Sequence, residues 1–203
     1  MADVDSGDAV AQSAPRERVT VASPGVVFFA RHGQCRSNVQ WPIDNYKDSE
    51  DGLTELGLHE AAACGRFLKA SFPNFSWRII SSALTRAIQT AELIQQVTEG
   101  VFVKKDPRLN EYGHPRERLD ALHQRVVGFL EDLSLESTDA NERFLVVTHG
   151  HVLEYLLYNA LGTESGLAGN KNMHSGLLGH ANGAVSAFHA GRMLLWNSHM
   201  HLV

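Results

Sequence analysis

The sequence of 203 residues has few cysteines, no long apolar run and no excess of positive charge. Cys35 and Cys64 are too few for a disulfide framework, so we expect a reducing, cytoplasmic location. No apolar stretch approaches the about eighteen residues of a membrane span, and we expect no membrane partner. The first residues carry neither a basic nor an apolar segment, which argues against a secretory signal.

The charge balance argues against a nucleic-acid partner. Asp and Glu outnumber Lys and Arg by 23 to 18, which gives a formal net charge of −5 at pH 7. A sequence-independent nucleic-acid binder would show a basic face, although a small basic pocket fits this balance. The G-x-S-x-G, G-x-G-x-x-G and P-loop motifs are also missing, which removes three common explanations for an α/β enzyme.

The rest of the composition is that of a soluble globular protein, with 43% apolar and 20% charged residues. Residues 1–24 are rich in Ala, Asp, Ser and Gly and show little periodicity, which predicts a mobile tail. Residues 25–203 are long enough for one domain with a sizeable core.

Strand and helix signals alternate along this domain. Continuous apolar runs predict buried strands, and apolar residues at helical spacing predict helices between them. The predicted strands are 26–30, 77–80, 101–103 and 144–147, and the predicted helices are 54–68, 84–94, 118–133 and 151–161. Alternating runs at 184–189 and 193–196 predict a hairpin. The expected fold is a three-layer α/β/α sandwich with a mostly parallel central sheet.

Polar residues and two glycines follow the predicted strands at the points where the strands end. They are Arg31, His32, Gly33, Gln34 and Asn38 after the first strand, Ser81, Ser82 and Arg86 after the second, Glu111 past the third, and Thr148, His149, Gly150 and His151 after the fourth. Ligands bind at the carboxyl ends of strands in open α/β sheets, so we expect these residues to meet at one edge.

The residue types at this edge suit phosphoryl transfer. A neutral imidazole such as that of His32 can attack phosphorus, and Gly33 beside it leaves room for a phosphate. Guanidiniums bind phosphate oxygens and neutralise their charge without a metal, and Arg86 also lies at a predicted helix N-terminus. A carboxyl group protonates a leaving alkoxide and then activates water. The sequence therefore predicts a metal-independent phosphate-ester enzyme with His32 as the nucleophile.

Five motifs in this order resemble the histidine phosphatase superfamily, also called the phosphoglycerate mutase-like family. They are Arg31-His32-Gly33 with Asn38, the segment 51–57, the segment 81–92 with Ala83 where proline is usual, Leu109-Asn110-Glu111, and Val147-Thr148-His149-Gly150. The resemblance runs from about Val27 to the end, and Leu195-Trp196-Asn197 is similar to endings in the phosphatase branch.

The resemblance implies a role for each matching residue. His32 would carry the phosphoryl group as a phosphohistidine, and Glu111 would be the proton donor and later the base. The residues implied in binding the phosphoryl group or the substrate are Arg31, Gln34, Asn38, Arg86, His149 and Gly150. The implied activity is that of a phosphomonoesterase without cofactor, acting on a small phosphorylated substrate or a phosphopeptide.

Two other functions remain open. A mutase would return the phosphoryl group to a second hydroxyl, and family mutases are longer after the acid/base. Here only Tyr112 to Arg118 separate Glu111 from the next predicted helix, which favours hydrolysis. A non-catalytic scaffold member is the other alternative, although such members usually lose the nucleophile or an arginine that is present here.

Several single residues also have two interpretations. Glu117 competes with Glu111 as the acid/base, and Cys35 is either a thiol with a lowered pKa or, as we favour, a packed side chain. His114, Arg116 and Arg118 either contact the substrate or form a solvated loop, and the segment 167–180 could line the pocket. The pair His149 and His151 lacks any metal-site spacing, so we expect no metal.

Overall fold

The computed structural model describes residues 25–113, 117–136, 139–161, 180–189 and 192–199. The predicted tail, residues 114–116 and most of the segment 167–180 lie outside these ranges. None of the described helices is long and apolar enough to cross a membrane.

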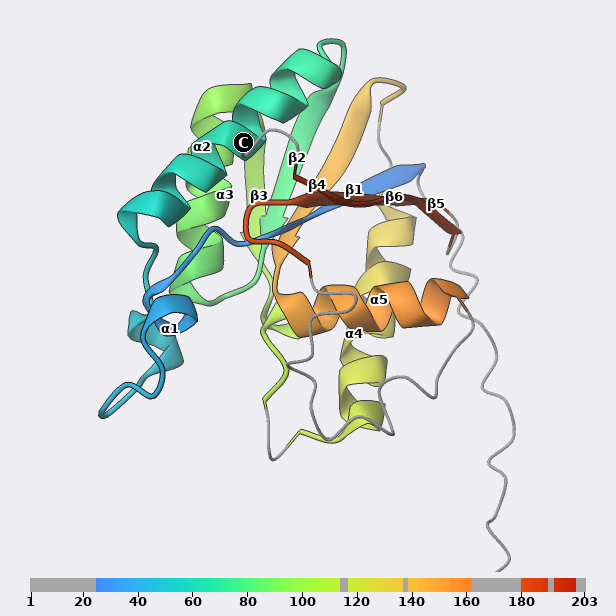
Figure 1. Ribbon diagram of the computed structural model, residues 1–203. Helices are drawn as coiled ribbons and strands as arrows, with labels where there is room; N and C mark the ends of the chain where they lie inside the picture. The colour runs from blue at the N-terminus through green and yellow to red at the C-terminus, as the bar shows by residue number, and fades with distance from the viewer. Residues whose placement is uncertain (1–24, 114–116, 137–138, 162–179, 190–191, 200–203) are drawn as a thin grey trace, which may run out of the picture.

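A six-stranded sheet forms the middle layer, with strand order β3-β2-β4-β1-β5-β6 (Figure 1). The strands are β1 (Val26–Arg31), β2 (Ser76–Ser81), β3 (Val101–Lys105), β4 (Glu142–Thr148), β5 (Val185–His189) and β6 (Arg192–Ser198). The four strands β1 to β4 run parallel to one another. The hairpin β5–β6 adds two antiparallel strands at one edge of the sheet. The predicted mostly parallel sheet and its hairpin are confirmed.

Helices cover both faces of the sheet (Figure 1). They are α1 (Arg36–Val39), α2 (Glu55–Ser71), α3 (Thr85–Thr98), α4 (Leu119–Leu135) and α5 (Gly150–Leu161), with short 3-10 turns η1 (Asp48–Glu50) and η2 (Pro107–Leu109). One core cluster contains residues of α4 and α5, and the other contains residues of α2 and α3. The three-layer α/β/α architecture is therefore confirmed.

The central strands β1 and β4 contain continuous apolar runs because both of their faces are buried there. In β1, Val27 and Phe29 pack with α4 and α5, whereas Phe28 and Ala30 pack with α2 and α3. Successive side chains of a strand point to opposite faces, so a strand between two helical layers needs apolar residues at every position. This is why the run at 26–30 predicts a strand so directly.

The two helices at the site begin in different ways. Thr54 caps α2, because its hydroxyl accepts a hydrogen bond from the Gly57 N–H at 3.1 Å. At α3, Leu84 is the N-cap residue and makes no side-chain capping hydrogen bond. Arg86 does lie in the first turn of α3, as predicted.

Candidate active site

Neighbouring parallel strands end side by side and bring distant segments together. Arg31 at the end of β1 pairs with Thr148 at the end of β4, and Ser81 at the end of β2 pairs with Val147. The His32 N–H donates to the Thr148 carbonyl at 3.0 Å, which fixes the chain just past β1. The residues that follow β1, β2 and β4 therefore meet at one edge of the sheet, as the sequence predicted.

The His32 ring is buried, and one of its nitrogens is occupied by the backbone. Its Nδ1 lies 2.7 Å from the carbonyl oxygen of Gly33. A carbonyl only accepts hydrogen bonds, so Nδ1 carries the hydrogen and Nε2 keeps its lone pair. Burial, followed by the charges of Arg31 and Arg86, holds the pKa of His32 well below its ordinary value. The ring is thus a neutral imidazole with Nε2 available as a nucleophile.

Glycines allow the loop after β1 to pass close to the start of α2. A Cβ atom at Gly33 would lie 2.3 Å from the Gly57 carbonyl oxygen, and one at Gly57 would lie 1.9 Å from the Gln34 carbonyl oxygen. The Gly33 N–H also donates to Thr90 Oγ1 of α3 at 3.0 Å. The backbone that carries His32 is therefore held between two helices.

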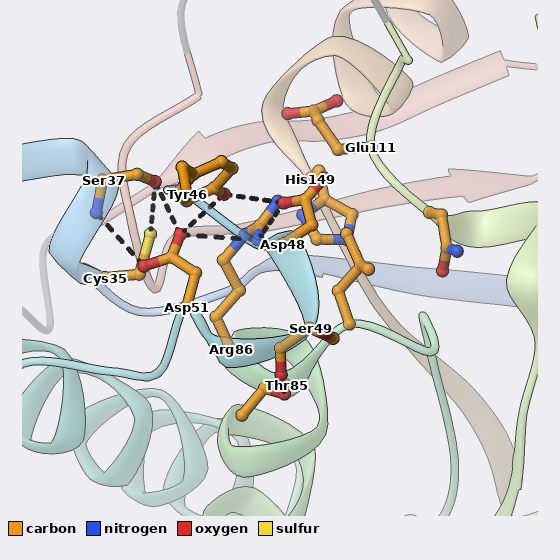
Figure 2. Close-up of polar contacts among 12 residues, drawn as sticks. Cys35, Ser37, Tyr46, Asp48, Ser49, Asp51, Thr85, Arg86, Glu111 and His149 are labelled. Carbon is orange, nitrogen blue, oxygen red and sulfur yellow. Dashed lines mark hydrogen bonds and ion pairs between the residues drawn. The ribbon is translucent and has the colours of Figure 1, made fainter. Parts of the chain in front are cut away.

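Two buried or half-buried guanidiniums lie near His32. The Nη1 of Arg31 donates to the His180 carbonyl, while its buried Nε has no hydrogen-bond partner in the described part of the chain. Arg86 donates through Nη1 to Asp48 Oδ1 at 2.7 Å and lies 3.5 Å from Asp51 Oδ2. Figure 2 shows Asp48, Asp51 and Tyr46 gathered around the Arg86 guanidinium.

His149 is the second buried imidazole at this edge. Its ring centroid lies 5.0 Å from that of His32, and its Nε2 lies 2.7 Å from Ser82 Oγ. Burial, together with the nearby His32, Arg86 and Arg31, holds the pKa of His149 well below its ordinary value. Both rings of this pair are therefore neutral at neutral pH.

Glu111 forms an ion pair with His151 in the first turn of α5. The Nδ1 of His151 lies 3.3 Å from Glu111 Oε1, which also accepts the Tyr112 N–H at 2.8 Å. Burial raises the pKa of Glu111, but His151, the Tyr112 N–H and Arg31 outweigh burial, and the net pKa is lowered. The same contact, opposed by burial, raises the pKa of His151. When the pair holds one proton, that proton lies mostly on the imidazole.

A comparison with protein families matches most of this domain. The model of the histidine phosphatase superfamily (branch 1) matches residues 27–116 and 112–188. The chain belongs to this superfamily.

Curated relatives in this superfamily match part of the chain. The 2,3-bisphosphoglycerate-dependent phosphoglycerate mutase of Neisseria gonorrhoeae (strain NCCP11945) is 38% identical over 92 residues, which make up 44% of this chain and 39% of the mutase. The enzyme of the same name from Methylorubrum extorquens (strain PA1) is 33% identical over 119 residues, 59% of this chain and 49% of the mutase. The match thus spans less than half the length of either relative.

Solved structures of superfamily phosphatases share the fold. The alpha-ribazole phosphatase of Shigella flexneri has a TM-score of 0.63 at 21% identity, covering 86% of this chain and 96% of the phosphatase. A mycobacterial glucosyl-3-phosphoglycerate phosphatase in complex with VO3 has a TM-score of 0.61 at 22% identity, covering 86% and 99% of the two chains. At this level of identity the likeness concerns the fold.

The remaining predicted site residues of this superfamily member lie in different surroundings. Gly150 lies against Arg31, because a Cβ atom at Gly150 would be 3.5 Å from the Arg31 Cζ. Asn38 and Gln34 also hold the loop: Asn38 Oδ1 accepts from the Cys35 N–H and from Asn182, and Gln34 Oε1 accepts from the Thr54 hydroxyl. These contacts use the amide oxygen of Asn38, and the binding of a phosphoryl group by Asn38 stays a prediction.

The structure also distinguishes between the alternative interpretations of several single residues. Glu117 forms a bidentate pair with Arg125, so Glu111 is the carboxylate that lies beside Arg31. Cys35 is fully buried and burial raises the pKa of its thiol, which agrees with a packed side chain. Arg118 is exposed and pairs with Asp120. Within the described ranges, no three His, Cys, Asp or Glu side chains are grouped so that they could hold a metal ion.

Sequence reasoning missed the polar partners of the site. Asp48 begins the short turn η1 and Asp51 follows it, and the sequence did not indicate that either carboxylate contacts Arg86 of α3. Asn110 lies inside a recognised motif, but its contact with Ser82 was not expected. Residue types alone could have suggested acidic partners for a buried arginine, but not which ones.

Proposed function

We propose that this superfamily member is a phosphomonoesterase in which His32 carries the phosphoryl group of a small phosphorylated substrate. The observation that supports it best is the state of His32: a buried, neutral ring with Nδ1–H bonded to the backbone and Nε2 unprotonated beside two guanidiniums. An imidazole fixed in this way is oriented and ready to attack without first losing a proton.

The reaction would run in two displacements. His32 Nε2 attacks phosphorus, the bond from phosphorus to the ester oxygen breaks, and Glu111 donates a proton to the leaving alkoxide. Water then attacks the phosphohistidine, with Glu111 as the base, and releases inorganic phosphate. Arg31, Arg86 and His149 would hold the phosphoryl oxygens, where prearranged charge stabilises the transition state.

The ion pair with His151 gives Glu111 a proton source. In the free protein the proton of the pair resides mostly on His151, because the pKa of Glu111 is lowered and that of His151 is raised. A bound phosphoryl group would bring negative charge beside Arg31 and Glu111 and so raise the pKa of this carboxyl. Substrate binding would then move the proton towards the group that must donate it.

Mapping the phosphoenzyme tests the proposal. Brief incubation with a reactive monoester such as p-nitrophenyl phosphate, a rapid quench and digestion at neutral or alkaline pH should place the phosphate on the peptide with His32. The His32→Ala variant should form no acid-labile phosphoenzyme. Phosphate on His149 or His151 would contradict the assigned roles, and activity that EDTA abolishes and a divalent ion restores would contradict metal independence.

A mutase is the second candidate, and one observation favours it. The curated relatives that match this chain at 33–38% identity are phosphoglycerate mutases. Against it stands the short connection after Glu111, since α4 begins at Leu119. A short segment after Glu111 would cover less of the site. Water could then attack the phosphohistidine, and the reaction would be hydrolysis.

A further inference from the structure

A chain of hydrogen bonds links His149 to two residues to which no role has yet been given. His149 Nε2 lies 2.7 Å from Ser82 Oγ, and Ser82 Oγ lies 3.0 Å from Asn110 Oδ1. Ser82 and His149 are fully buried. Buried polar groups must satisfy one another, so the direction of each bond in this chain can be worked out.

The backbone fixes the direction at the Asn110 end. Asn110 Oδ1 accepts the Ala83 N–H at 2.9 Å, which identifies that atom as the amide oxygen, an acceptor only. The Ser82 hydroxyl must therefore donate its single hydrogen to Asn110. Ser82 Oγ already accepts the Leu84 N–H at 3.1 Å, and its remaining lone pair is left for His149. His149 Nε2 consequently carries the hydrogen of the neutral ring and donates it to Ser82.

This direction leaves His149 with a bare lone pair on Nδ1. Among the described residues, Nδ1 is buried and has no hydrogen-bond partner. Nε2 is occupied by Ser82, so any contact between His149 and a phosphoryl group must use Nδ1. The oxygens of a phosphoryl dianion are also acceptors. Two lone pairs repel each other, and the contact becomes a hydrogen bond only when a proton lies between them.

We propose that Ser82 and Asn110 are positioning residues that lock neutral His149 in the Nε2–H form, so that the site binds a phosphoryl group together with one proton shared between His149 Nδ1 and a phosphoryl oxygen. The proton comes from solvent and no other bond changes. The second part rests on the proposed function, because it requires that the phosphoryl group bind at His149. The lock itself concerns the free protein.

The charges around His149 explain why the proton arrives only with the anion. His32 and Arg31 face it from the end of β1, Arg86 from α3 and Arg125 from α4, and with burial they disfavour an imidazolium in the free protein. The pair of Glu111 and His151 interacts with the charge of Arg31. A bound dianion reverses the sign of this environment and makes protonation of Nδ1 favourable.

Sulfate is the probe that tests the coupling, because it remains a dianion between about pH 6 and pH 8 and cannot bring a proton itself. Calorimetric titration in buffers of different ionisation enthalpy counts the protons taken up per sulfate. Ser82→Ala frees Nε2, and Asn110→Ala frees the Ser82 hydroxyl to donate to Nε2. Both variants should take up about one proton fewer than the wild type. For each unit by which the pH rises, the factor by which sulfate affinity falls should therefore be about tenfold smaller in the variants than in the wild type.

The matched control is Ser81→Ala. Ser81 is buried beside Ser82 in sequence, but its hydroxyl donates to the Ser82 carbonyl. It should keep the proton count of the wild type. His32 also has a bare nitrogen and can be protonated when sulfate binds, so the difference between variants is the test and not the absolute count. Equal proton uptake in the wild type, Ser82→Ala and Asn110→Ala would overturn the proposal.

Nitrogen-15 NMR of histidine-labelled full-length protein separates failure of the lock from failure of the proposed site. In the free wild type at about pH 8, His149 should show the Nε2–H pattern, and Ser82→Ala should shift it towards Nδ1–H. An Nδ1–H ring in the free wild type would overturn the lock whether or not sulfate binds. The expected Nε2–H ring without any sulfate binding would instead count against the phosphoryl site and therefore against the coupled proton.

Discussion

At the scale of single residues, His32 and His149 are both neutral and buried, but they offer different nitrogens to a ligand. In His32, Nδ1–H donates a hydrogen bond to the Gly33 carbonyl and Nε2 keeps a free lone pair. In His149, Nε2–H donates to Ser82 Oγ and Nδ1 keeps a free lone pair. The hydrogen-bond partner of one ring nitrogen therefore decides which nitrogen of the ring remains free to react or to bind. A phosphoryl group between them would contact His32 through Nε2 and His149 through Nδ1.

Replacing Glu111 by Gln should separate proton donation from the shape of the site. The amide keeps the volume but has no transferable proton, so turnover of an alkyl phosphate should fall about 10²–10⁴-fold. p-Nitrophenolate leaves with little protonation, and its ester should lose far less. Rates for a series of leaving groups measure this directly. An equal loss for good and poor leaving groups would mean that Glu111 only shapes the site.

Replacing His151 by Gln should move the alkaline limb of the pH–rate profile to lower pH. In the wild type the pair keeps its proton until the pH passes the raised pKa of His151, which lies above its ordinary value of about 6.5. Without the imidazole the proton remains only on Glu111 and is lost at lower pH. The measurement is kcat/KM for an alkyl phosphate against pH. His123→Gln, which removes an imidazole paired with Tyr155 instead, should leave this limb in place. An unmoved limb in His151→Gln would show that the pair does not supply the proton.

At the scale of elements, the site depends on how closely the loop after β1 approaches α2. Gly57→Ala would place a Cβ atom 1.9 Å from the Gln34 carbonyl oxygen, so the loop or the helix must move. Overpacking of this kind typically costs about 1–3 kcal/mol, and kcat should fall because the same loop carries His32. Gly128→Ala in α4 is the control. There the nearest atom is 3.9 Å away, and the change should stabilise the fold by about 0.5–1 kcal/mol. Denaturant unfolding and kcat of both variants decide between these outcomes.

The turn η1 places a carboxylate where an anion would bind. Asp48 Oδ1 lies 2.7 Å from Arg86 Nη1, and half of the Asp48 side chain is exposed. We expect Asp48→Asn to increase affinity for sulfate by about two- to fivefold, as removal of a partly exposed charge pair suggests. Glu50→Gln is the matched control, because Glu50 pairs with exposed Lys47. Unchanged affinity in Asp48→Asn would mean that Asp48 and the anion do not compete for Arg86.

At the scale of the whole molecule, the sequence predicts the features that leave a regular pattern in it and misses contacts that depend on individual turns. The strands were predictable because burial on both faces demands apolar residues at successive positions, as in Phe144 to Val147. Arg31, His32, Arg86 and His149 could be placed at one edge because parallel strands end side by side. The contact between Arg86 and Asp48 depends on the short turn η1, and that between Ser82 and Asn110 on the turn after β3. Neither leaves a periodic pattern in the sequence.

Whether the whole molecule acts as a hydrolase or as a mutase depends on how well the chain shields the phosphoenzyme from water. The match covers only 39% and 49% of the two mutases, and the connection between Glu111 and α4 is short. With 3-phosphoglycerate we therefore expect release of inorganic phosphate to exceed conversion to 2-phosphoglycerate, measured in parallel coupled assays on one preparation. His32→Ala is the control, since both reactions need the phosphohistidine and both must disappear. A second measurement is the lifetime of the phosphoenzyme after excess substrate is removed: an open site should lose its phosphate to water within a few turnovers. Isomerisation that outpaces phosphate release, together with a long-lived phosphoenzyme, would reverse the order and make the protein a mutase.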